Sequence, residues 1–297
     1  MILRELRELF GYHSRFGKRF AEHDCNNVFE KAIRDLALFG FGELEGKSVL
    51  DLGCGQRYPF ALQSAARGAI TTALDIDYIK PDFLPLALYH TVRHNGFKRA
   101  VKSALRQLVF DRDYYSMLEA AAGKSLRYFR SEITFVVSDP ASAKYSLPSN
   151  SFDLIASNAV VEHVADVPRF AAEIRRLLLR GGYFYAIIHN FYSLSGGHNL
   201  EWAFPDEHPS TRVPPWDHLR ENRFPAWSHL NRLRPEEYRE AFKRELEVVF
   251  FEGRDINHDP RGGEGEHLLT PEIAAELAAY HRELLLTRAW CIICRKT

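Results

Sequence analysis

The sequence has no run of 18 apolar residues, so it offers no helix that could span a bilayer. Acidic and basic residues are equal in number, 39 of each, which removes any general attraction to nucleic acids or anionic membranes. The first ten residues carry interspersed charges and lack the apolar centre of a signal peptide. We therefore expect a cytoplasmic protein with neither a membrane nor a nucleic acid as its partner.

Cysteine is scarce, and four scattered residues are too few for a disulfide framework. Cys291 and Cys294 form a C-x-x-C pair, but the apolar run Trp290–Cys294 is typical of a buried strand. Residues three apart on a strand face opposite ways, which argues against a joint redox or zinc role. The length of 297 residues and the 46% hydrophobic content fit one large α/β domain spanning residues 1–297.

A third glycine is missing from a turn of the nucleotide-binding kind. The pattern Val49–Leu52 predicts a buried strand, and Gly53 and Gly55 follow it directly. Two glycines one residue apart allow a sharp bend and a close approach to a ligand. The dinucleotide fingerprint G-x-G-x-x-G needs a glycine where this chain has Tyr58. An acid, Asp51, precedes the first glycine instead.

Strand and helix patterns alternate after this turn. A helix is expected over residues 58–67, with free N–H groups that face the turn. The next strand pattern, Ile70–Asp77, contains Asp75, which lies 20 residues after Gly55. An acid at this place can accept hydrogen bonds from the hydroxyls of a ribose. A solvated aspartate at a strand end is the alternative.

Three more strand patterns cover residues 133–138, 151–158 and 183–188. Asp139 and Pro140 follow the first of them, and an acid there can take the amino group of an adenine. A helix is expected between the other two, ending at Gly181-Gly182. Five strands with intervening helices predict a parallel, doubly wound sheet whose ligands bind at the carboxyl ends of the strands.

Six motifs now stand in order: Asp51-Leu52-Gly53-Cys54-Gly55, Leu74-Asp75, Ser138-Asp139-Pro140, Ser151-Phe152-Asp153-Leu154-Ile155, Val161-Glu162-His163-Val164 and Arg180-Gly181-Gly182. Over roughly residues 45–190 this succession resembles class I S-adenosylmethionine (SAM) methyltransferases. The resemblance implies a Rossmann-like α/β fold with a seven-stranded sheet, and SAM as cofactor. The glycines would contact the methionine part, and the two strand-end acids the ribose and the adenine. The predicted cofactor-binding residues are Asp51, Gly53, Gly55, Asp75, Ile76, Asp139, Pro140 and Asn158.

Two features depart from the family pattern. Arg57 stands where many members carry a further glycine, and it could crowd the loop. A helical insertion over residues 78–132 interrupts the alternation, and we expect it to pack beside the core. Its predicted apolar face consists of Phe97, Val101, Leu105 and Leu108, and its basic stripe of Lys98, Lys102 and Arg106.

The two ends of the chain complete the predicted domain. Residues 1–44 form a helical cover with a first amphipathic helix that could act as a lid, and a second helix over residues 27–39. The resemblance also implies a sixth strand and an antiparallel seventh. Residues 246–251 and 287–294 fit these strands, and helices over 235–245 and 271–286 precede them.

Residues 190–231 are the least core-like part of the chain, with three tryptophans, five prolines and four histidines. A loop of this length inside a compact domain is usually functional or disordered, and its aromatic content argues against disorder. A packed cap over the sheet edge is the alternative. We predict a substrate arm, in which tryptophans such as Trp202 stack on sugar or aromatic rings.

Methyl transfer to a hydroxyl needs an oriented acceptor and a base. Histidine suits this role near neutral pH, and His163 and His229 are the predicted catalytic residues. Glu162 and His163 also resemble part of the E-x-x-E-H metal motif of small-RNA 2′-O-methyltransferases. Because Ala159 replaces the first acid, we expect no metal and activity that survives chelators, although His198 could supply a further ligand.

The sequence therefore favours an enzyme that transfers the methyl group of SAM to a hydroxyl oxygen of a small molecule or a glycan. One alternative is a methyltransferase that acts on RNA or on another nucleophile. Another is a non-catalytic, SAM-binding regulatory protein. An NAD-dependent oxidoreductase would need a glycine in place of Tyr58. The acceptor, its reacting atom and the oligomeric state stay open.

Overall fold

The computed structural model describes residues 17–77, 89, 91–94, 96–203, 205, 208–226, 228–254 and 263–297. The predicted lid helix around Leu3 to Phe10 lies outside these residues, as does Trp227. Two compact units are present: unit 1 is Met1–Pro140 with Asn150–Ala156, and unit 2 is Ala141–Ser149 with Ser157–Thr297. Within the described ranges, no helix combines the length and the apolar character that a membrane crossing needs.

Seven strands form a sheet in the order β3-β2-β1-β4-β5-β7-β6. The strands are β1 (Ser48–Leu52), β2 (Ile70–Asp75), β3 (Thr134–Val137), β4 (Phe152–Asn158), β5 (Leu178–His189), β6 (Glu247–Arg254) and β7 (Ala289–Arg295). β1, β2 and β3 pair in parallel, whereas β7 runs antiparallel to both β5 and β6. The predicted Rossmann-like α/β sheet with an antiparallel seventh strand is confirmed.

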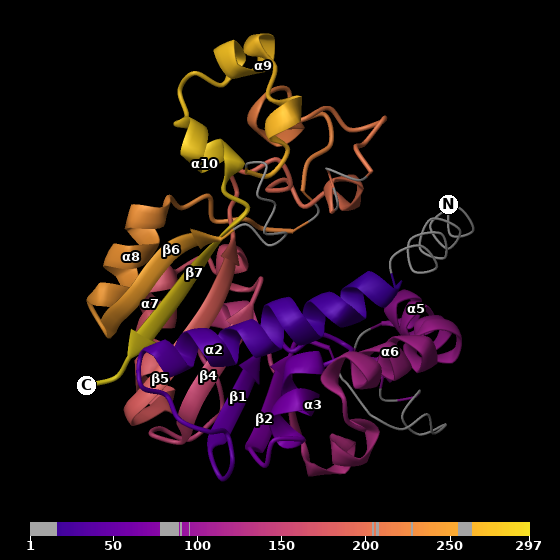
Figure 1. Cartoon of the computed structure of the whole chain (residues 1–297), viewed down its shortest axis with the longest axis vertical. Coiled ribbons are helices and arrows are strands. Elements are labelled where there is room, and N and C mark those ends of the chain that lie inside the picture. The colour runs from indigo at the N-terminus through magenta and orange to yellow at the C-terminus, as the bar shows by residue number, and fades with distance from the viewer. Residues whose placement is uncertain are drawn as a thin grey trace. The chain divides into compact units, whose positions relative to one another are not determined.

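In unit 1, the parallel strands β1 and β2 lie beside α3 (Pro59–Ala65), as Figure 1 shows. The chain is helical from residue 17 to Leu38, through a π-helical turn η1 (Asp24–Glu30) that leads into α2 (Lys31–Leu38). The expected helix start near residue 27 is therefore wrong. A π turn holds one more residue than an α turn, so it shifts the apolar spacing from which the start was predicted.

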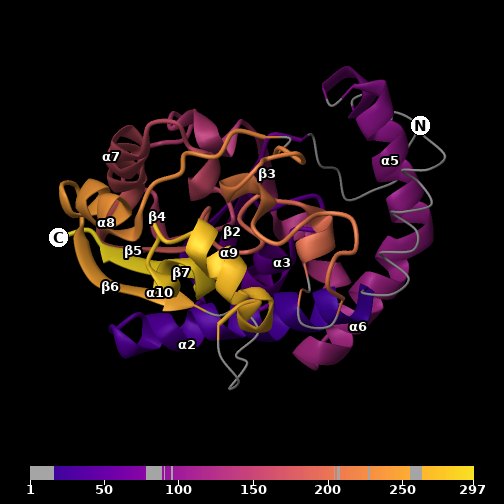
Figure 2. The ribbon, with the colours of Figure 1, turned by 90° about the horizontal axis from the view of Figure 1, so that it is seen from above.

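The insertion contributes a continuous helical stretch to unit 1 (Figure 2), made of α5 (Phe97–Arg106), η2 (Gln107–Asp111) and α6 (Arg112–Ala122). Tyr114 and Leu118 of α6 pack into a buried cluster with residues of β2 and α3. The predicted apolar face of α5 is wrong, because Phe97 is 72% exposed and Leu108 in η2 is 65% exposed. Ala100 and Ser103 face inward instead. The insertion also contains the 3-10 turn η3 (Arg127–Glu132), and a further 3-10 turn, η4 (Pro140–Ser142), follows β3.

In unit 2, α7 (Val167–Leu177) and α8 (Pro235–Lys243) lie beside β5, β6 and β7 (Figure 1). The rings of Phe184 in β5 and Phe242 in α8 stack with centroids 5.3 Å apart. The helix that was expected to end at Gly181-Gly182 already ends at Leu177. The two glycines belong to β5, and their backbone exchanges hydrogen bonds with Lys296, which directly follows β7.

The arm over residues 190–231 packs against the segment that precedes β7. The two stretches share a buried cluster made of Leu194, Trp202, Val213, Trp216, Leu277 and Leu285. The single helix expected over residues 271–286 is two short helices, and the yellow ribbon of Figure 1 shows the break. The elements of this part are η6 (Leu200–Trp202), η7 (Asp217–Leu219), η8 (Glu266–Leu268), α9 (Pro271–Glu276) and α10 (Arg282–Leu286).

Candidate functional site

The glycine turn after β1 has the backbone shape that its sequence predicts. Gly53 and Gly55 have φ angles of 81° and 65°, in the left-handed region that favours glycine. The N–H groups of Gly53 and Cys54 both donate to the carbonyl of Leu74 in β2, at 2.8 and 3.1 Å. A Cβ atom added to Gly55 would have no atom within 4 Å. The turn is therefore held by its hydrogen bonds to β2, and it borders open space at Gly55.

Asp75 ends β2 beside this turn. Its carboxylate accepts the N–H of Gly55 at 2.9 Å and the N–H of Asp77 at 3.0 Å. These two bonds orient the side chain, and a carboxylate can accept about four hydrogen bonds in all. Ile76, which follows, is exposed. The predicted ribose acid is thus part of the same local structure as the glycine turn.

The end of β3 lies next to the end of β2. The N–H of Ser138 donates to the carbonyl of Asp75 at 2.9 Å. Asp139 and Pro140 follow at once, with Asp139 exposed. The structure therefore brings the predicted residues of β1, β2 and β3 to one edge of unit 1. Asn158 ends β4 in unit 2, where it is also exposed.

Asp51 lies beneath the turn. It is buried, and its carboxylate accepts the N–H of Ala61 in the first turn of α3 at 3.0 Å. The expectation that the N–H groups at this helix start are free is thus wrong for Ala61. Burial raises the pKa of Asp51 to about 7, and the nearby charge of Asp75 adds to the rise. Asp51 shapes the site by joining β1 to α3.

Two side chains of the turn connect it to the insertion. Arg57 does not crowd the loop as expected, because its guanidinium bonds Asp111 at 2.8 Å and lies 4.2 Å from the centre of the Tyr114 ring. Gln56 donates to Asp77 at 2.6 Å and accepts the hydroxyl proton of Ser103 at 2.9 Å. The motif gave no signal for Gln56, since its partner is 47 residues away in α5.

In unit 2, the predicted base His163 lies in the short helix η5 (Val161–His163). Its Nδ1 is 2.8 Å from the backbone carbonyl of His229. A carbonyl can only accept, so Nδ1 carries a proton, and the tautomer that this bond selects has its lone pair on Nε2. The ring of His229 is itself exposed, and the structure shows only its carbonyl in contact with His163.

Asn231 holds η5 in place. Its side-chain amide donates to the carbonyls of Val161 and Val164 at 2.8 and 3.0 Å. Its backbone N–H donates to the carbonyl of Glu162 at 2.8 Å, and its side-chain oxygen accepts the hydroxyl proton of Tyr238. Asn231 thereby positions both Glu162 and His163. The sequence predicted no role for it, because nothing near it in the chain indicates these partners.

Glu162 is the most deeply buried acid near His163. It is 2% exposed, and neither carboxylate oxygen makes a hydrogen bond of good geometry. Burial raises its pKa to about 8, although the backbone N–H groups of Glu162 and His189 act in the opposite direction. An acid in this state holds its proton near neutral pH unless a cation joins it.

Two further histidines lie beside Glu162. The rings of His189, at the end of β5, and His198 stack with centroids 4.7 Å apart, and the ring of His163 meets His198 edge-on at 5.0 Å. Burial lowers the pKa of His198 to about 4 and that of His189 well below its usual value. Both rings are neutral at pH 7. The sequence analysis named His198 but not His189, because the strand it predicted stops at residue 188, whereas β5 extends to His189.

Comparison with known proteins identifies the family of this chain. The model of a family described as a methyltransferase domain matches residues 25–245. The chain belongs to this family. A search of curated proteins with the sequence of this chain found no match.

Similar solved structures include a SAM-dependent methyltransferase from Mesorhizobium loti, with 18% identity over 89% of this chain and 97% of that chain, at a TM-score of 0.46. Geranyl diphosphate C-methyltransferase from Streptomyces coelicolor has 12% identity over 90% of this chain and 77% of that chain, at a TM-score of 0.47. Phosphoethanolamine N-methyltransferase 2 from Haemonchus contortus has 16% identity over 90% of this chain and 52% of that chain, at a TM-score of 0.43.

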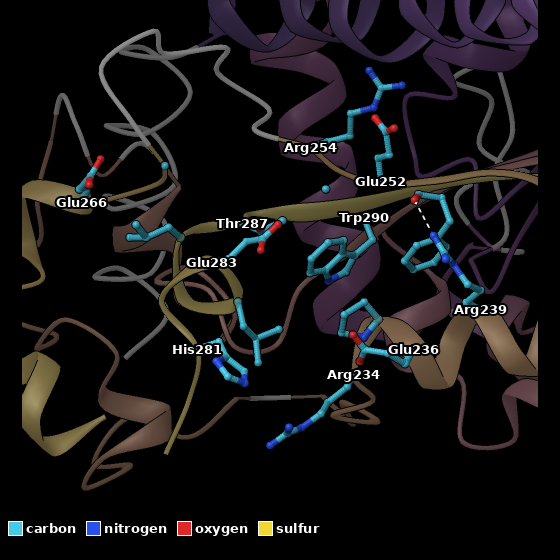
Figure 3. A pocket seen from close by; sticks show the side chains of 16 residues that line it. Arg234, Glu236, Arg239, Glu252, Arg254, Glu266, His281, Glu283, Thr287 and Trp290 are labelled. Atoms are coloured by element: carbon cyan, nitrogen blue, oxygen red, sulfur yellow. Dashed lines mark hydrogen bonds between the residues drawn. The ribbon is translucent and has the colours of Figure 1, made fainter. Parts of the chain in front are cut away.

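Unit 2 of the methyltransferase also contains a cavity of about 970 Å³ between β6, β7, α8 and the segment around α10 (Figure 3). Side chains of both charge signs line it, among them Arg234, Glu236 and Glu283. Arg239 donates to the carbonyl of Phe251 at 3.1 Å, the bond dashed in Figure 3. None of the predicted site residues lines this cavity.

The buried acid Asp51 makes the stability of the methyltransferase depend on pH. Its pKa is about 7 in the folded chain, against an ordinary value of 3.8. The folded state then binds more protons between these values, so the free energy of unfolding falls as pH rises from 4 to 7. Asp51→Asn should flatten this decline and stabilise the protein at pH 8 by about 2–4 kcal/mol.

Urea unfolding between pH 5 and pH 8 measures this effect. Asp153→Asn is the matched control, since Asp153 accepts the N–H of Ser48 in the same unit but is only partly buried. Identical pH profiles for wild type and Asp51→Asn would show that Asp51 is ionised at no cost to stability.

Proposed function

We propose that this methyltransferase transfers the methyl group of SAM to a hydroxyl oxygen of a small molecule or a glycan. The observation that carries the cofactor assignment is the meeting of the glycine turn with the ends of β2 and β3. The Gly55 N–H and the Asp75 carboxylate are joined at 2.9 Å, and the Ser138 N–H ties Asp139 to the same edge.

The chemistry of these groups fits SAM. Gly55 borders open space in which the methionine part of the cofactor can approach the backbone. Asp75 is oriented by two backbone donors and can accept hydrogen bonds from the ribose hydroxyls. The exposed side chain of Ile76 offers an apolar surface to the adenine, and Asp139 can accept a hydrogen bond from its amino group.

A hydroxyl acceptor fits the state of His163. In the transfer, the acceptor oxygen forms a bond to the methyl carbon while the bond from that carbon to the sulfur breaks. The hydroxyl proton must then leave, and the Nε2 lone pair of His163 can take it. The carbonyl of His229 supports this role because it fixes the ring tautomer. We assign acceptor binding to the arm over residues 190–231.

The cofactor assignment predicts that Asp75→Ala weakens SAM binding by about 30–150-fold, because two hydrogen bonds to the ribose are worth about 2–3 kcal/mol. Titration calorimetry with SAM, S-adenosylhomocysteine and NAD measures this. Asp113→Ala is the matched control, since Asp113 is an exposed acid of α6 in the same unit. Circular dichroism checks that both variants stay folded.

Unchanged SAM affinity in folded Asp75→Ala, or tight binding of NAD, would contradict the assignment. A separate experiment identifies the acceptor: the protein is incubated with extracted metabolites and glycans in the presence of radiolabelled SAM. Label that appears only in RNA or only on nitrogen would favour one of the other acceptor classes.

A further inference from the structure

Three potential metal ligands from separate parts of unit 2 meet beside His163. They are Glu162 in η5, His189 at the end of β5 and His198 in the arm. One carboxylate oxygen and one nitrogen of each ring all lie within 4.8 Å of one another. Sequence separations of 27 and 9 residues divide the three, so no local motif forces them together. Their meeting is a property of the folded unit.

Glu162 indicates that the cluster lacks a component. A buried carboxyl group without a hydrogen-bond partner is costly and is rare in folded proteins. Both oxygens of Glu162 are in this condition at 2% exposure of the residue. Neither neighbouring ring corrects it, since Nε2 of His198 is 4.0 Å from the nearer oxygen. A cation between the carboxylate and the two rings would satisfy all three groups.

His189 is oriented by a hydrogen bond from one ring nitrogen, as histidines that bind metals commonly are. Its Nε2 is 2.8 Å from Ser195 Oγ, whose proton is donated to the carboxylate of Glu264 at 3.0 Å. Glu264 is itself buried and bonds Arg288 at 2.8 Å. The ring therefore donates its Nε2–H to Ser195 and keeps a lone pair on Nδ1. Such an outer hydrogen bond fixes the tautomer and orientation of histidines that bind metals.

The backbone of His198 adds to this picture. Its φ angle is 55°, in the left-handed region that residues other than glycine adopt at a cost. Conformations of this kind persist where the surrounding structure enforces them, often at ligand sites. Here the conformation accompanies a ring that stacks on His189.

We propose that Glu162, His189 and His198 bind one divalent transition-metal ion. Two imidazoles and one carboxylate suit zinc, manganese, cobalt or iron(II) rather than magnesium or calcium, which prefer oxygen ligands. Bonds of about 2.1 Å in a tetrahedral arrangement place ligand atoms about 3.4 Å apart, so ion binding draws the three side chains together by about 1 Å. The proposal replaces the expectation from the sequence that no metal binds.

Three protein ligands leave at least one coordination position open. The ion would hold an oxygen of the methyl acceptor there and lower the pKa of a hydroxyl, which makes it a better nucleophile. This role of the open position rests on the proposed function, whereas binding of the ion does not.

Equilibrium dialysis of the metal-stripped protein with Zn²⁺, Mn²⁺ and Mg²⁺ tests the site, together with visible absorption spectra after addition of Co²⁺. We expect one Zn²⁺ per chain, weaker Mg²⁺ binding, and cobalt bands of a four- or five-coordinate ion. Glu162→Gln and His198→Gln should each weaken Zn²⁺ binding at least 100-fold. Ser195→Ala, which removes only the outer hydrogen bond of His189, should weaken it about 10–100-fold.

His208→Gln is the matched control, because His208 is an exposed histidine of the same arm. Glu162→Gln keeps the side-chain size and removes the only carboxylate ligand of the cluster, and circular dichroism verifies its fold. Absence of Zn²⁺ binding by the wild type, or equal Zn²⁺ binding by wild type and folded Glu162→Gln, would overturn the site. Full methyl transfer by the metal-free protein would overturn the role of the open position. Intact Zn²⁺ binding without SAM binding would sink the proposed function alone.

Discussion

Replacing His163 with glutamine is expected to lower turnover by about 10²–10⁴-fold, the usual contribution of a general base. Glutamine keeps a donor for the carbonyl of His229, so the local structure of η5 should survive. It has no basic nitrogen that could take the acceptor proton. Because the proposed cofactor residues lie at the ends of β1 to β4 and not in η5, the affinity for SAM should stay within about threefold of wild type.

Single-turnover kinetics with radiolabelled SAM and the identified acceptor measure this loss separately from product release. His267→Gln makes the same change at an exposed position of η8, outside the arm, and should turn over like wild type. A loss confined to the Michaelis constant would mean that His163 only helps to bind the acceptor. Full activity of the glutamine variant would show that the methyl acceptor needs no base from this residue.

Replacing Trp202 with alanine is expected to lower the free energy of unfolding by about 3–5 kcal/mol, the usual cost of removing a buried tryptophan. Trp202 is 2% exposed and packs with Trp216, Leu277 and Leu285 in the cluster that joins the arm to the segment before β7. The prediction from the sequence that this side chain stacks on an acceptor ring is thus wrong. The alanine variant loses the packing that holds the arm.

Urea unfolding followed by circular dichroism measures the change. Trp202→Phe keeps most of the apolar volume and should cost much less, while Tyr128→Ala truncates a ring that is 76% exposed and should cost almost nothing. If Trp202→Ala retains wild-type stability and loses activity alone, the side chain acts on the acceptor after all.

The sequence predicted the sheet well because its signals are local. The strand before Gly53 is a short, largely apolar run that leads into two glycines, and both glycines have positive φ angles in the structure. Asp75 could be placed because it directly follows an apolar run and lies 20 residues after Gly55. Elements that are defined by backbone hydrogen bonds to residues far away in the sequence were harder to predict. Gly181 and Gly182 suggest a helix end, yet their partner Lys296 makes them part of a strand.

The histidine cluster is a second case in which contacts between distant residues could not be predicted from the sequence. Glu162 and His163 are neighbours in the sequence and suggested a metal or catalytic role, whereas His189 received no prediction because it lies just beyond the strand predicted over residues 183–188. What makes His189 special is its contact with Ser195 and, through it, with Glu264, 75 residues further along the chain. Likewise, the positioning of η5 by Asn231 depends on how a loop returns to it across about 70 residues. Such contacts follow from tertiary packing and leave no periodic pattern in the sequence.

The burial of all four cysteines has a practical side. Cys54 lies inside the glycine turn, where burial and the neighbouring charges of Asp51 and Asp75 raise the pKa of its thiol well above the ordinary value. Neutral, covered thiols react slowly with oxidants and alkylating reagents, because the thiolate is the reactive form. A single cysteine introduced at an exposed position such as Tyr128 can therefore carry a fluorescent label while the native four remain in place. Such a reporter would follow ligand binding in the otherwise unaltered enzyme.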